Sequence, residues 1–284
     1  MIQSLEHFNI VKIAESGQCF RIRCTQDGLW LAAANGRVLR IRVLSEDQNG
    51  VSTCDFDCDG REFQEFWKDY FDLDTDYAAL CRLADPADPY LQAAIEYGRG
   101  IRILKQNLWE TTISFIISQR KNIPAIRRCV EMLCDAYGPE TENGIHAFPS
   151  PEALAGASLE DLKKCSLGYR ASYVHMSARM ILEAGLAGDE LWAPEIGGGN
   201  FPAEKKEISP QSASEKLLSL PGVGAKISSC ILLFALHDMA AFPRDTWMLR
   251  IEKKYYGGRF PEEKYPSCAG LMQQYMFFYE KRKP

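Results

Sequence analysis

The sequence lacks the features that would assign it to several protein classes. No apolar run in its 284 residues approaches the length of a membrane span, so we expect no membrane partner. The opening MIQSLEHFNI has neither the basic start nor the apolar core of a signal peptide, and we expect a cytoplasmic location. Only Cys268 lies beyond residue 230, which excludes a cysteine-ligated iron–sulfur cluster near the C-terminus. The other cysteine spacings lack the second pair or the histidines of a zinc site, so no metal is predicted.

An excess of positive charge, which is typical of proteins that bind nucleic acids, is also missing, because the net charge is −5. The charge is unevenly distributed, however. Residues 1–98 contain 9 Lys and Arg against 17 Asp and Glu, whereas residues 99–284 contain 24 against 21. Phosphate binding depends on charge within a Debye length of ~8–10 Å. The composition therefore permits a phosphate-binding surface in the second segment without indicating one.

The apolar pattern changes from strands to helices along the chain. The first fifty residues read as strands, with Asp27-Gly28 and Asn35-Gly36 as hairpin turns between alternating apolar and polar residues. From Phe63 the apolar spacing lengthens toward that of a helix, and from Trp109 it is helical almost throughout. Residues 194–209 are rich in glycine, proline and charge, which predicts a surface loop.

This pattern predicts an α+β fold that is mainly α. We place a β-rich domain at residues 1–98 and a helical domain at residues 99–284. Within the second domain, residues 211–236 predict a helical hairpin, since QSASEKLLSL and AKISSCILLFAL both have helical spacing and LPGVG separates them. Gly222 and Gly224 permit a positive φ and the close approach of another backbone. The N–H groups that begin the second helix form an anion site suited to a phosphodiester.

Lys226 directly follows this turn, inside the start of the second helix. It reads either as a solvated lysine or phosphate contact, or as a nucleophile. Cys230 lies one turn further along the same face, and Ile227, Leu232 and Leu233 supply apolar surroundings. A lysine amine attacks only when it is neutral, and desolvation is the usual way in which nucleophilic lysines are made.

Asp245 lies nineteen residues after Lys226, in the sequence AFPRDTWMLRI. It precedes a run with helical spacing, so the simplest interpretation is a helix N-cap. It also reads as a carboxylate that relays protons or stabilises developing positive charge beside the lysine. Both readings are compatible, because an N-cap aspartate is rigidly placed.

LPGVGAK followed by PRD at this spacing resembles the helix-hairpin-helix DNA glycosylases, and more narrowly the 8-oxoguanine DNA glycosylases. Four further stretches resemble elements of that family in the same order: SGQCFR, SFIISQRKNI, LGYRASY and CAGLMQQYMFF. The resemblance spans nearly the whole chain. It implies a twisted antiparallel N-terminal β-domain followed by a helical bundle that contains the helix-hairpin-helix motif.

The resemblance also implies a pocket for an extruded base. Cys230 and Phe277 would enclose the flipped base, Gln273 would hydrogen-bond its Watson–Crick edge, and the backbone carbonyl of Gly17 would accept the N7–H that distinguishes oxidised guanine. Such a single contact contributes ~1–3 kcal/mol, only part of the discrimination. Each of these residues, taken alone, also has an ordinary structural reading.

The DNA contacts implied by the resemblance include Tyr169, which would fill the gap left by the base, and Arg170, which would face the opposite base. The other implied DNA contacts are Arg120, Lys121, Asn122, Gly222, Gly224, Ile227 and Trp247. The sequence differs from the eukaryotic pattern at Arg120 and Lys121, where that pattern has asparagines, and at Pro124 and Ala125, where it has alanine and arginine. We therefore expect weaker discrimination of the base opposite the lesion.

The implied reaction is attack of Lys226 on the sugar C1′, with catalytic assistance from Asp245, followed by strand nicking through β-elimination. No cofactor is required. The implied partner is double-stranded DNA containing 8-oxoguanine, bound by a monomer that would be nucleoid-associated in a bacterium. Three alternatives stay open: a related glycosylase for another damaged purine, a non-catalytic DNA-binding module, and a helical scaffold. Water-dependent glycosylases need no lysine at position 226, and phosphate binding alone gains nothing from a fixed Asp245.

Overall fold

The computed structural model describes residues 1–47, 50–141, 143–183 and 209–283. Most of the predicted loop at residues 194–209 lies outside these residues. The chain forms two compact units, and each is described by itself. The first unit comprises residues 1–31, 39–105 and 233–284, and the second comprises residues 32–38 and 106–232. The predicted division of domains between residues 98 and 99 stays a prediction.

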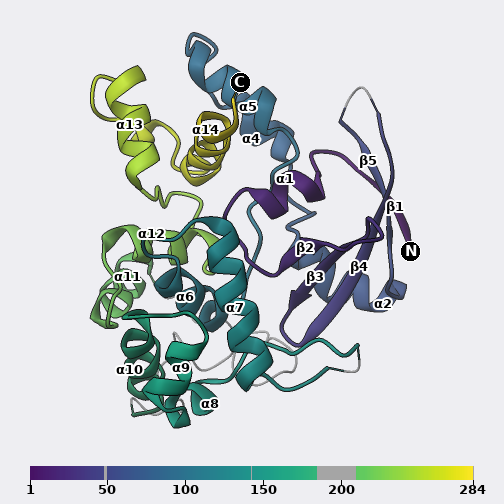
Figure 1. Ribbon diagram of the computed structural model, residues 1–284. Helices are drawn as coiled ribbons and strands as arrows, with labels where there is room; N and C mark the ends of the chain where they lie inside the picture. Colours follow the sequence, from purple (N-terminus) through teal and green to yellow (C-terminus); the bar gives the residue numbers. More distant parts are fainter. Residues whose placement is uncertain (48–49, 142, 184–208, 284) are drawn as a thin grey trace. The chain divides into compact units, whose positions relative to one another are not determined.

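The N-terminal segment contains a five-stranded antiparallel sheet in the order β1-β5-β4-β3-β2 (Figure 1). Strand β1 pairs with β5, with Ile2 opposite Asp55, and β4 pairs with β5 with a register shift between Val43 and Ser45. The strands are β1 (Ile2–Leu5), β2 (Ile22–Cys24), β3 (Trp30–Ala34), β4 (Arg37–Glu46) and β5 (Ser52–Phe56). The antiparallel sheet confirms the predicted β-rich N-terminal segment.

Both predicted hairpin turns lie between strands. Gly28 separates β2 from β3 and has a φ of +80°. Asn35 and Gly36 separate β3 from β4, with φ values of +49° and +72°. Two consecutive positive φ values are typical of the tight turns that match the twist of a hairpin. The local sequence therefore decides where these strands end.

Residues 10–15 differ from the prediction, because they form helix α1 (Ile10–Glu15) and not a strand. The side chain of Asn9 caps this helix by accepting a hydrogen bond from the N–H of Lys12 at 3.0 Å. Ile10 and Ile13 are buried, and they lie on one face of the helix. A six-residue helix is too short for its periodicity to be distinguished from that of a strand.

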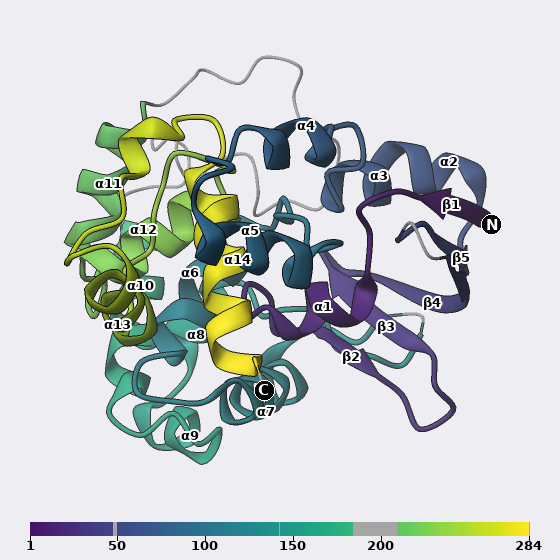
Figure 2. The ribbon, with the colours of Figure 1, turned by 90° about the horizontal axis from the view of Figure 1, so that it is seen from above.

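The remaining helices of the first unit include α5 and α14, which pack side by side although they are far apart in the sequence (Figures 1 and 2). Gly98 of α5 makes this approach possible, since an added Cβ would lie 2.4 Å from the ring of Tyr275 on α14. Besides α1, the helices of the first unit are α2 (Gly60–Glu62), a π-helix (Phe63–Trp67), α3 (Lys68–Tyr70), α4 (Tyr77–Arg82), α5 (Pro89–Gly98), α13 (Thr246–Tyr255), a 3₁₀ turn (Glu262–Lys264) and α14 (Ala269–Arg282).

The second unit consists mainly of helices. Helix α10 packs against α8 and α6, and α6 also contacts α7. The helices are α6 (Leu108–Ile117), α7 (Ile123–Tyr137), α8 (Pro151–Gly156), α9 (Leu159–Lys164), α10 (Arg170–Glu183), α11 (Pro210–Ser219) and α12 (Ala225–Phe234), of which α12 continues into the first unit by two residues. Among the described residues, no helix is long and apolar enough to cross a membrane.

Most carboxylates of the acidic run from Asp55 to Asp76 make contacts within the fold. Asp59 and Asp76 cap α2 and α4 through hydrogen bonds to backbone N–H groups. Other carboxylates of the run form ion pairs with nearby cations: Asp55 with the N-terminal amine, Asp57 with Arg40, Glu65 with Arg61, Asp69 with Lys105 and Asp74 with Lys68. Most carboxylates of this acidic run therefore either cap a helix or pair with a nearby cation.

Candidate active site

The hairpin turn joins α11 to α12 through residues 220–224. Val223 donates its N–H to the carbonyl of Leu220 at 3.1 Å, and the hydrogen bonds of α12 begin where Ser228 donates to the carbonyl of Gly224 at 2.9 Å. The N–H groups of the first turn of α12 precede any intrahelical acceptor, and the helix dipole is positive at this end. This end of α12 can bind an anionic oxygen.

The two glycines of the turn have different structural roles. Gly222 has a φ of +82°, and an added Cβ would lie 2.5 Å from Cδ2 of Tyr173. Gly224 has nothing within 4 Å of such a Cβ, and its φ lies outside the left-handed region. The fold therefore requires a glycine at position 222. At Gly224 the open space is available to a ligand.

Lys226 lies in the first turn of α12 and is half-buried. Its Nζ atom is 5.3 Å from the centre of the Phe115 ring, which comes from the buried face of α6. Cys230 follows one turn later on α12 and is 3% exposed. The amine thus lies beside an aromatic ring, at the helix end that is suited to a phosphate.

The predicted DNA-contacting loop lies between α6 and α7. Arg120 is exposed and has a φ of +52°. Lys121 donates from Nζ to the carbonyl of Ser166 at 3.1 Å. Asn122 caps α7 by accepting the N–H of Ala125 at 2.9 Å, so its side chain already has a structural role.

The next predicted contacts, Tyr169 and Arg170, lie at the start of α10. Tyr169 is 50% exposed, and its ring meets the ring of Tyr173 edge to face at 5.8 Å. Arg170 is 7% exposed and donates to two protein carbonyls, those of Gln119 and Leu167. Its guanidinium carbon lies 4.4 Å from the centre of the Tyr169 ring. The side chain of Tyr169 is therefore exposed to solvent, whereas that of Arg170 is buried.

Asp245, in the first unit, is the N-cap of α13. Its Oδ1 atom accepts the N–H groups of Trp247 and Met248, both at 2.9 Å. The preceding residue, Arg244, donates from Nε to the buried Glu252 at 3.0 Å, which fixes the chain on the other side of Asp245. The N-cap prediction is confirmed. The carboxylate is rigidly held, as a catalytic role would require.

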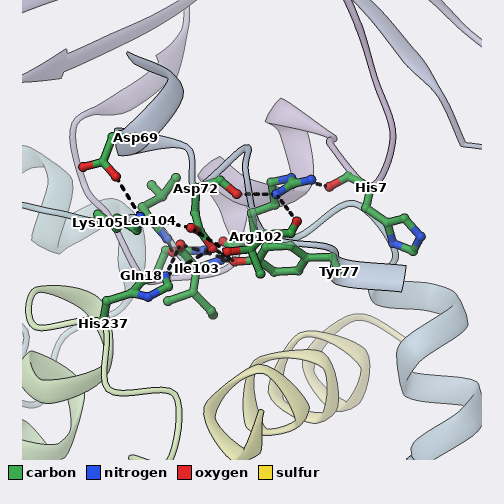
Figure 3. A network of polar contacts seen from close by, with 11 residues as sticks. His7, Gln18, Asp69, Asp72, Tyr77, Arg102, Ile103, Leu104, Lys105 and His237 are labelled. Atoms are coloured by element: carbon green, nitrogen blue, oxygen red, sulfur yellow. Dashed lines mark hydrogen bonds and ion pairs between the residues drawn. The ribbon is translucent and has the colours of Figure 1, made fainter. Parts of the chain in front are cut away.

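A buried network holds the segment between α12 and α13 within the first unit (Figure 3). Asp72, 1% exposed, accepts hydrogen bonds from Thr75 and Tyr77 and lies 3.3 Å from Nε2 of His237 and 3.2 Å from Nζ of Lys105. Burial alone raises the pKa of Asp72, but the contact with His237 and the other donors outweigh it and hold that pKa below its usual value. Burial, together with Asp72, raises the pKa of Tyr77.

The remaining predicted pocket residues also lie in the first unit. Gly17 has a φ of +83° and follows the fully buried Ser16. The side chain of Gln18, also fully buried, donates to the carbonyl of Arg102 at 2.8 Å and accepts the N–H of Leu104 at 2.8 Å (Figure 3). The conformation of the Gly17 backbone is thus fixed by its neighbours.

On α14, Gln273 is buried, and its Oε1 atom accepts a hydrogen bond from Nε2 of Gln274 at 3.0 Å. Phe277 is half-buried and lies one turn further along, with Nζ of Lys281 at 5.4 Å from its ring centre. Trp247 is half-buried in the first turn of α13, and its ring lies 5.4 Å from the guanidinium carbon of Arg250.

The predicted residues are therefore distributed over both units. Within the second unit the structure brings together the hairpin turn, Lys226, the loop after α6 and the start of α10. Four residues of the site region were missed from the sequence: Phe115, Gln119, Tyr173 and Glu252. Phe115 and Gln119 lie inside the stretch SFIISQRKNI and Tyr173 inside LGYRASY, but their contacts depend on distant residues. No group of three or more metal-ligating side chains occurs within the ranges that the structure describes.

Two helices joined by a glycine turn, with a lysine in the first turn of the second helix, form a helix-hairpin-helix arrangement. Residues 1–112 match the family described as 8-oxoguanine DNA glycosylase, N-terminal domain, and residues 113–265 match the HhH-GPD superfamily base excision DNA repair proteins. The chain belongs to the HhH-GPD superfamily and, within it, to the 8-oxoguanine DNA glycosylase family.

Individual relatives agree with this assignment. The N-glycosylase/DNA lyase of Saccharomyces cerevisiae is 35% identical over 167 residues, which are 56% of this chain and 42% of the yeast protein. The chain thus spans less than half the length of that relative. The structure of MBOgg1 in complex with a low affinity DNA ligand has a TM-score of 0.84 at 31% identity, over 99% of this chain and 94% of that one.

A bacterial structure is similar as well. The Clostridium acetobutylicum 8-oxoguanine glycosylase/lyase, in complex with double-stranded DNA containing cytosine opposite 8-oxoguanine, has a TM-score of 0.83 at 28% identity. The similarity covers 99% of this chain and 97% of that chain. The predicted α+β fold, mainly α, with an N-terminal sheet and a helix-hairpin-helix bundle, is confirmed.

Proposed function

We propose that this protein is a base excision repair DNA glycosylase that removes 8-oxoguanine from duplex DNA and then nicks the strand as an AP lyase. One observation carries the proposal: Lys226 lies in the first turn of α12, directly after the glycine turn and against the ring of Phe115. Phosphate binding alone would not need both this lysine and the rigidly held carboxylate of Asp245. The names of the yeast and clostridial relatives support the same activity.

The reaction assigned to Lys226 is nucleophilic. The neutral amine attacks C1′ of the damaged nucleotide, the N-glycosidic bond breaks, and its electron pair leaves with the base, which gains a proton. The sugar ring then opens and the nitrogen forms a Schiff base with C1′. The Schiff base acidifies the proton at C2′, whose loss expels the 3′-phosphate by β-elimination. No metal or redox cofactor is needed for these steps.

Asp245 is assigned the charge-stabilising role. Positive charge develops on the sugar as the glycosidic bond breaks, and a fixed carboxylate stabilises it. The hydrogen bonds from Trp247 and Met248 hold the carboxylate in one orientation before the substrate arrives. Less reorganisation is then needed during the reaction.

Base recognition is assigned to four residues. Cys230 and Phe277 would contact the faces of the base, Gln273 its Watson–Crick edge, and the carbonyl of Gly17 its N7–H. The fixed backbone around Gly17, held by the buried Gln18, supports this role because a carbonyl that reads one proton must not move.

Duplex binding is assigned mainly to backbone and basic groups of the second unit. The N–H groups at Gly224 and Ile227 would contact phosphate, and Arg120 and Lys121 would contact the strands near the lesion. Tyr169, half exposed at the start of α10, would fill the gap in the stack. Trp247 and the cap residue Asn122 are secondary contacts in this proposal. We further propose that the protein acts as a monomer in the cytoplasm, on the nucleoid if it is bacterial.

Borohydride trapping tests the proposal. Native protein, Lys226→Gln and the matched control Lys163→Gln, whose lysine is exposed on α9, are mixed with duplex carrying a single 8-oxoguanine. Native protein and the control should form a covalent adduct, whereas Lys226→Gln should bind the duplex without forming one. Adduct formation by Lys226→Gln, or no adduct from native protein that binds the duplex, would refute the lysine mechanism.

A further inference from the structure

The side chain of Gln119 links two segments of the second unit that lie far apart in the sequence. Its Nε2 atom donates to the carbonyl of Ile116 at 3.0 Å, at the end of α6, and to the carbonyl of Gly222 at 3.1 Å, in the hairpin turn. The second bond joins residues 103 positions apart. Both N–H groups of the amide are therefore used to fix the loop after α6 against the turn that precedes Lys226.

The backbone of Gln119 forms a second link. Its carbonyl oxygen accepts hydrogen bonds from Nε and Nη2 of Arg170, with the Nε distance at 2.9 Å, and Nη1 of Arg170 donates to the carbonyl of Leu167 at 3.2 Å. Charge-assisted bonds from a guanidinium to a single carbonyl are strong and directional. Arg170 is thereby held inside the protein, and its plane supports the ring of Tyr169 at 4.4 Å.

A third contact closes the cluster. The ring of Tyr173 lies edge to face with Tyr169, and the same ring packs so closely on Gly222 that no Cβ would fit there. Two routes therefore run from Tyr169 to the hairpin turn: one through Arg170 and Gln119, the other through Tyr173. Both reach Gly222, four residues before Lys226.

We propose that Gln119 is a positioning residue, which holds the exposed ring of Tyr169 in a fixed position relative to the hairpin turn. Gln119 binds the turn and also holds Arg170, and Arg170 in turn supports the ring of Tyr169. The proposal rests on the function proposed above. A ring that replaces an extruded base in the stack must resist being displaced as the base returns. Residues whose orientation is fixed by neighbouring hydrogen bonds meet this requirement at low entropic cost.

The structure favours this role for Arg170 over contact with the opposite base. Its guanidinium is buried, and each of its three nitrogens already donates to a protein carbonyl. Turning it toward the opposite base would break these bonds and leave the carbonyl of Gln119 without its donor. By contrast, the side chain of Arg120, one residue after Gln119, is exposed and can contact the DNA.

The test separates base extrusion from chemistry. Gln119→Met keeps the volume of the side chain and removes both donors. Gln92→Met is the matched control, because the Gln92 amide likewise donates to a backbone carbonyl, that of Asp85, but lies on α5, away from the hairpin turn in the sequence. Two substrates are used: a duplex with 8-oxoguanine and a duplex with a preformed abasic site. The abasic site has no base to unstack, so a well-held Tyr169 matters less for it.

We expect Gln119→Met to lower the single-turnover rate of excision about tenfold or more, the equivalent of ~1.4 kcal/mol. Borohydride trapping on the abasic duplex should fall by less than about threefold, and Gln92→Met should match native protein on both substrates. An equal loss on the two substrates, or no loss on the lesion, overturns the proposal. Native protein that neither excises nor traps refutes the proposed function itself, and this inference with it.

A second variant guards against a folding defect in the first. Arg170→Lys keeps the charge and cannot form the forked contact with the carbonyls of Gln119 and Leu167. If Gln119 and Arg170 act through one cluster, the double variant should lose less activity than the product of the two single losses. Losses that multiply independently, at unchanged melting temperature, would contradict the shared role.

Discussion

The carboxylate of Asp245 accepts the backbone N–H of Met248 at 2.9 Å, three residues further along, and thereby caps α13. The N–H of Trp247 reaches the same oxygen, Oδ1, so the cap uses one of the two carboxylate oxygens. A residue proposed for catalysis is thus also a structural residue, and its two roles can be separated by substitution.

Asp245→Asn should separate them, because asparagine caps helices as well as aspartate does but carries no charge. We expect its melting temperature to stay close to that of native protein and its rate of base excision to fall by about 100-fold or more, since a preorganised charge in an active site contributes several kcal/mol. Asp245→Ala should lose the activity and also ~1 kcal/mol of stability. Single-turnover excision and thermal unfolding of the three proteins give the answer. Full activity of Asp245→Asn would show that Asp245 only caps the helix.

The two glycines of the hairpin turn should respond differently to alanine. Gly222→Ala should lower the free energy of unfolding by about 1–3 kcal/mol, because φ is +82° and the new Cβ would meet Tyr173. Gly224→Ala should fold normally, since nothing lies within 4 Å of its Cβ, yet bind duplex DNA more weakly if a phosphate approaches there. Chemical denaturation and fluorescence anisotropy with labelled duplex distinguish the two. Normal duplex affinity in Gly224→Ala would argue against a phosphate at this position.

The buried carboxylate of Asp72 should make stability depend on pH. Its pKa is lowered in the folded protein, so its contribution is present above the unfolded pKa of ~3.9 and is lost as the pH falls through the folded value. Asp72→Asn should therefore be less stable by about 3–5 kcal/mol near neutral pH, as expected when one partner of a buried pair is removed.

Denaturant unfolding at about pH 7, 5 and 3 checks this dependence, because the gap between Asp72→Asn and native protein should narrow in acid as the native carboxylate takes up a proton. Asp74→Asn is the control: Asp74 pairs with Lys68 but is 75% exposed, so its loss should cost less than about 1 kcal/mol at any of these values. A gap for Asp72→Asn that stays constant between neutral and acid pH would contradict the assignment of a charged Asp72.

The base opposite the lesion should have little influence on the rate. Arg120 and Lys121 replace the asparagines of the eukaryotic pattern, and Arg170 is held by protein carbonyls. Excision rates opposite C, A, G and T, measured at saturating enzyme, should agree within about threefold, less than ~1 kcal/mol. A rate that favours cytosine by more than about tenfold would refute this prediction.

Features that depend on a few neighbouring residues could be predicted from the sequence. The hairpin turns at Gly28 and Asn35-Gly36, the cap at Asp245 and the turn before Lys226 all follow from backbone preferences and from side chains that bond within three residues. The same local chemistry explains why Asn122 caps α7, although the sequence suggested only a DNA contact there. Helix α1 was read as a strand because six residues carry too little periodicity to decide.

The sequence by itself predicted a strand-rich start followed by helices, because glycine, proline and capping residues act locally and the apolar period records which face is buried. The family and the candidate nucleophile followed from the resemblance of its motifs to those of the 8-oxoguanine DNA glycosylases. Only the tertiary structure decided which residues surround these sites. The contact of Gln119 with Gly222, that of Lys226 with Phe115 and the buried partners of Asp72 join residues far apart in the chain. Such contacts depend on how helices pack, and no local preference encodes them.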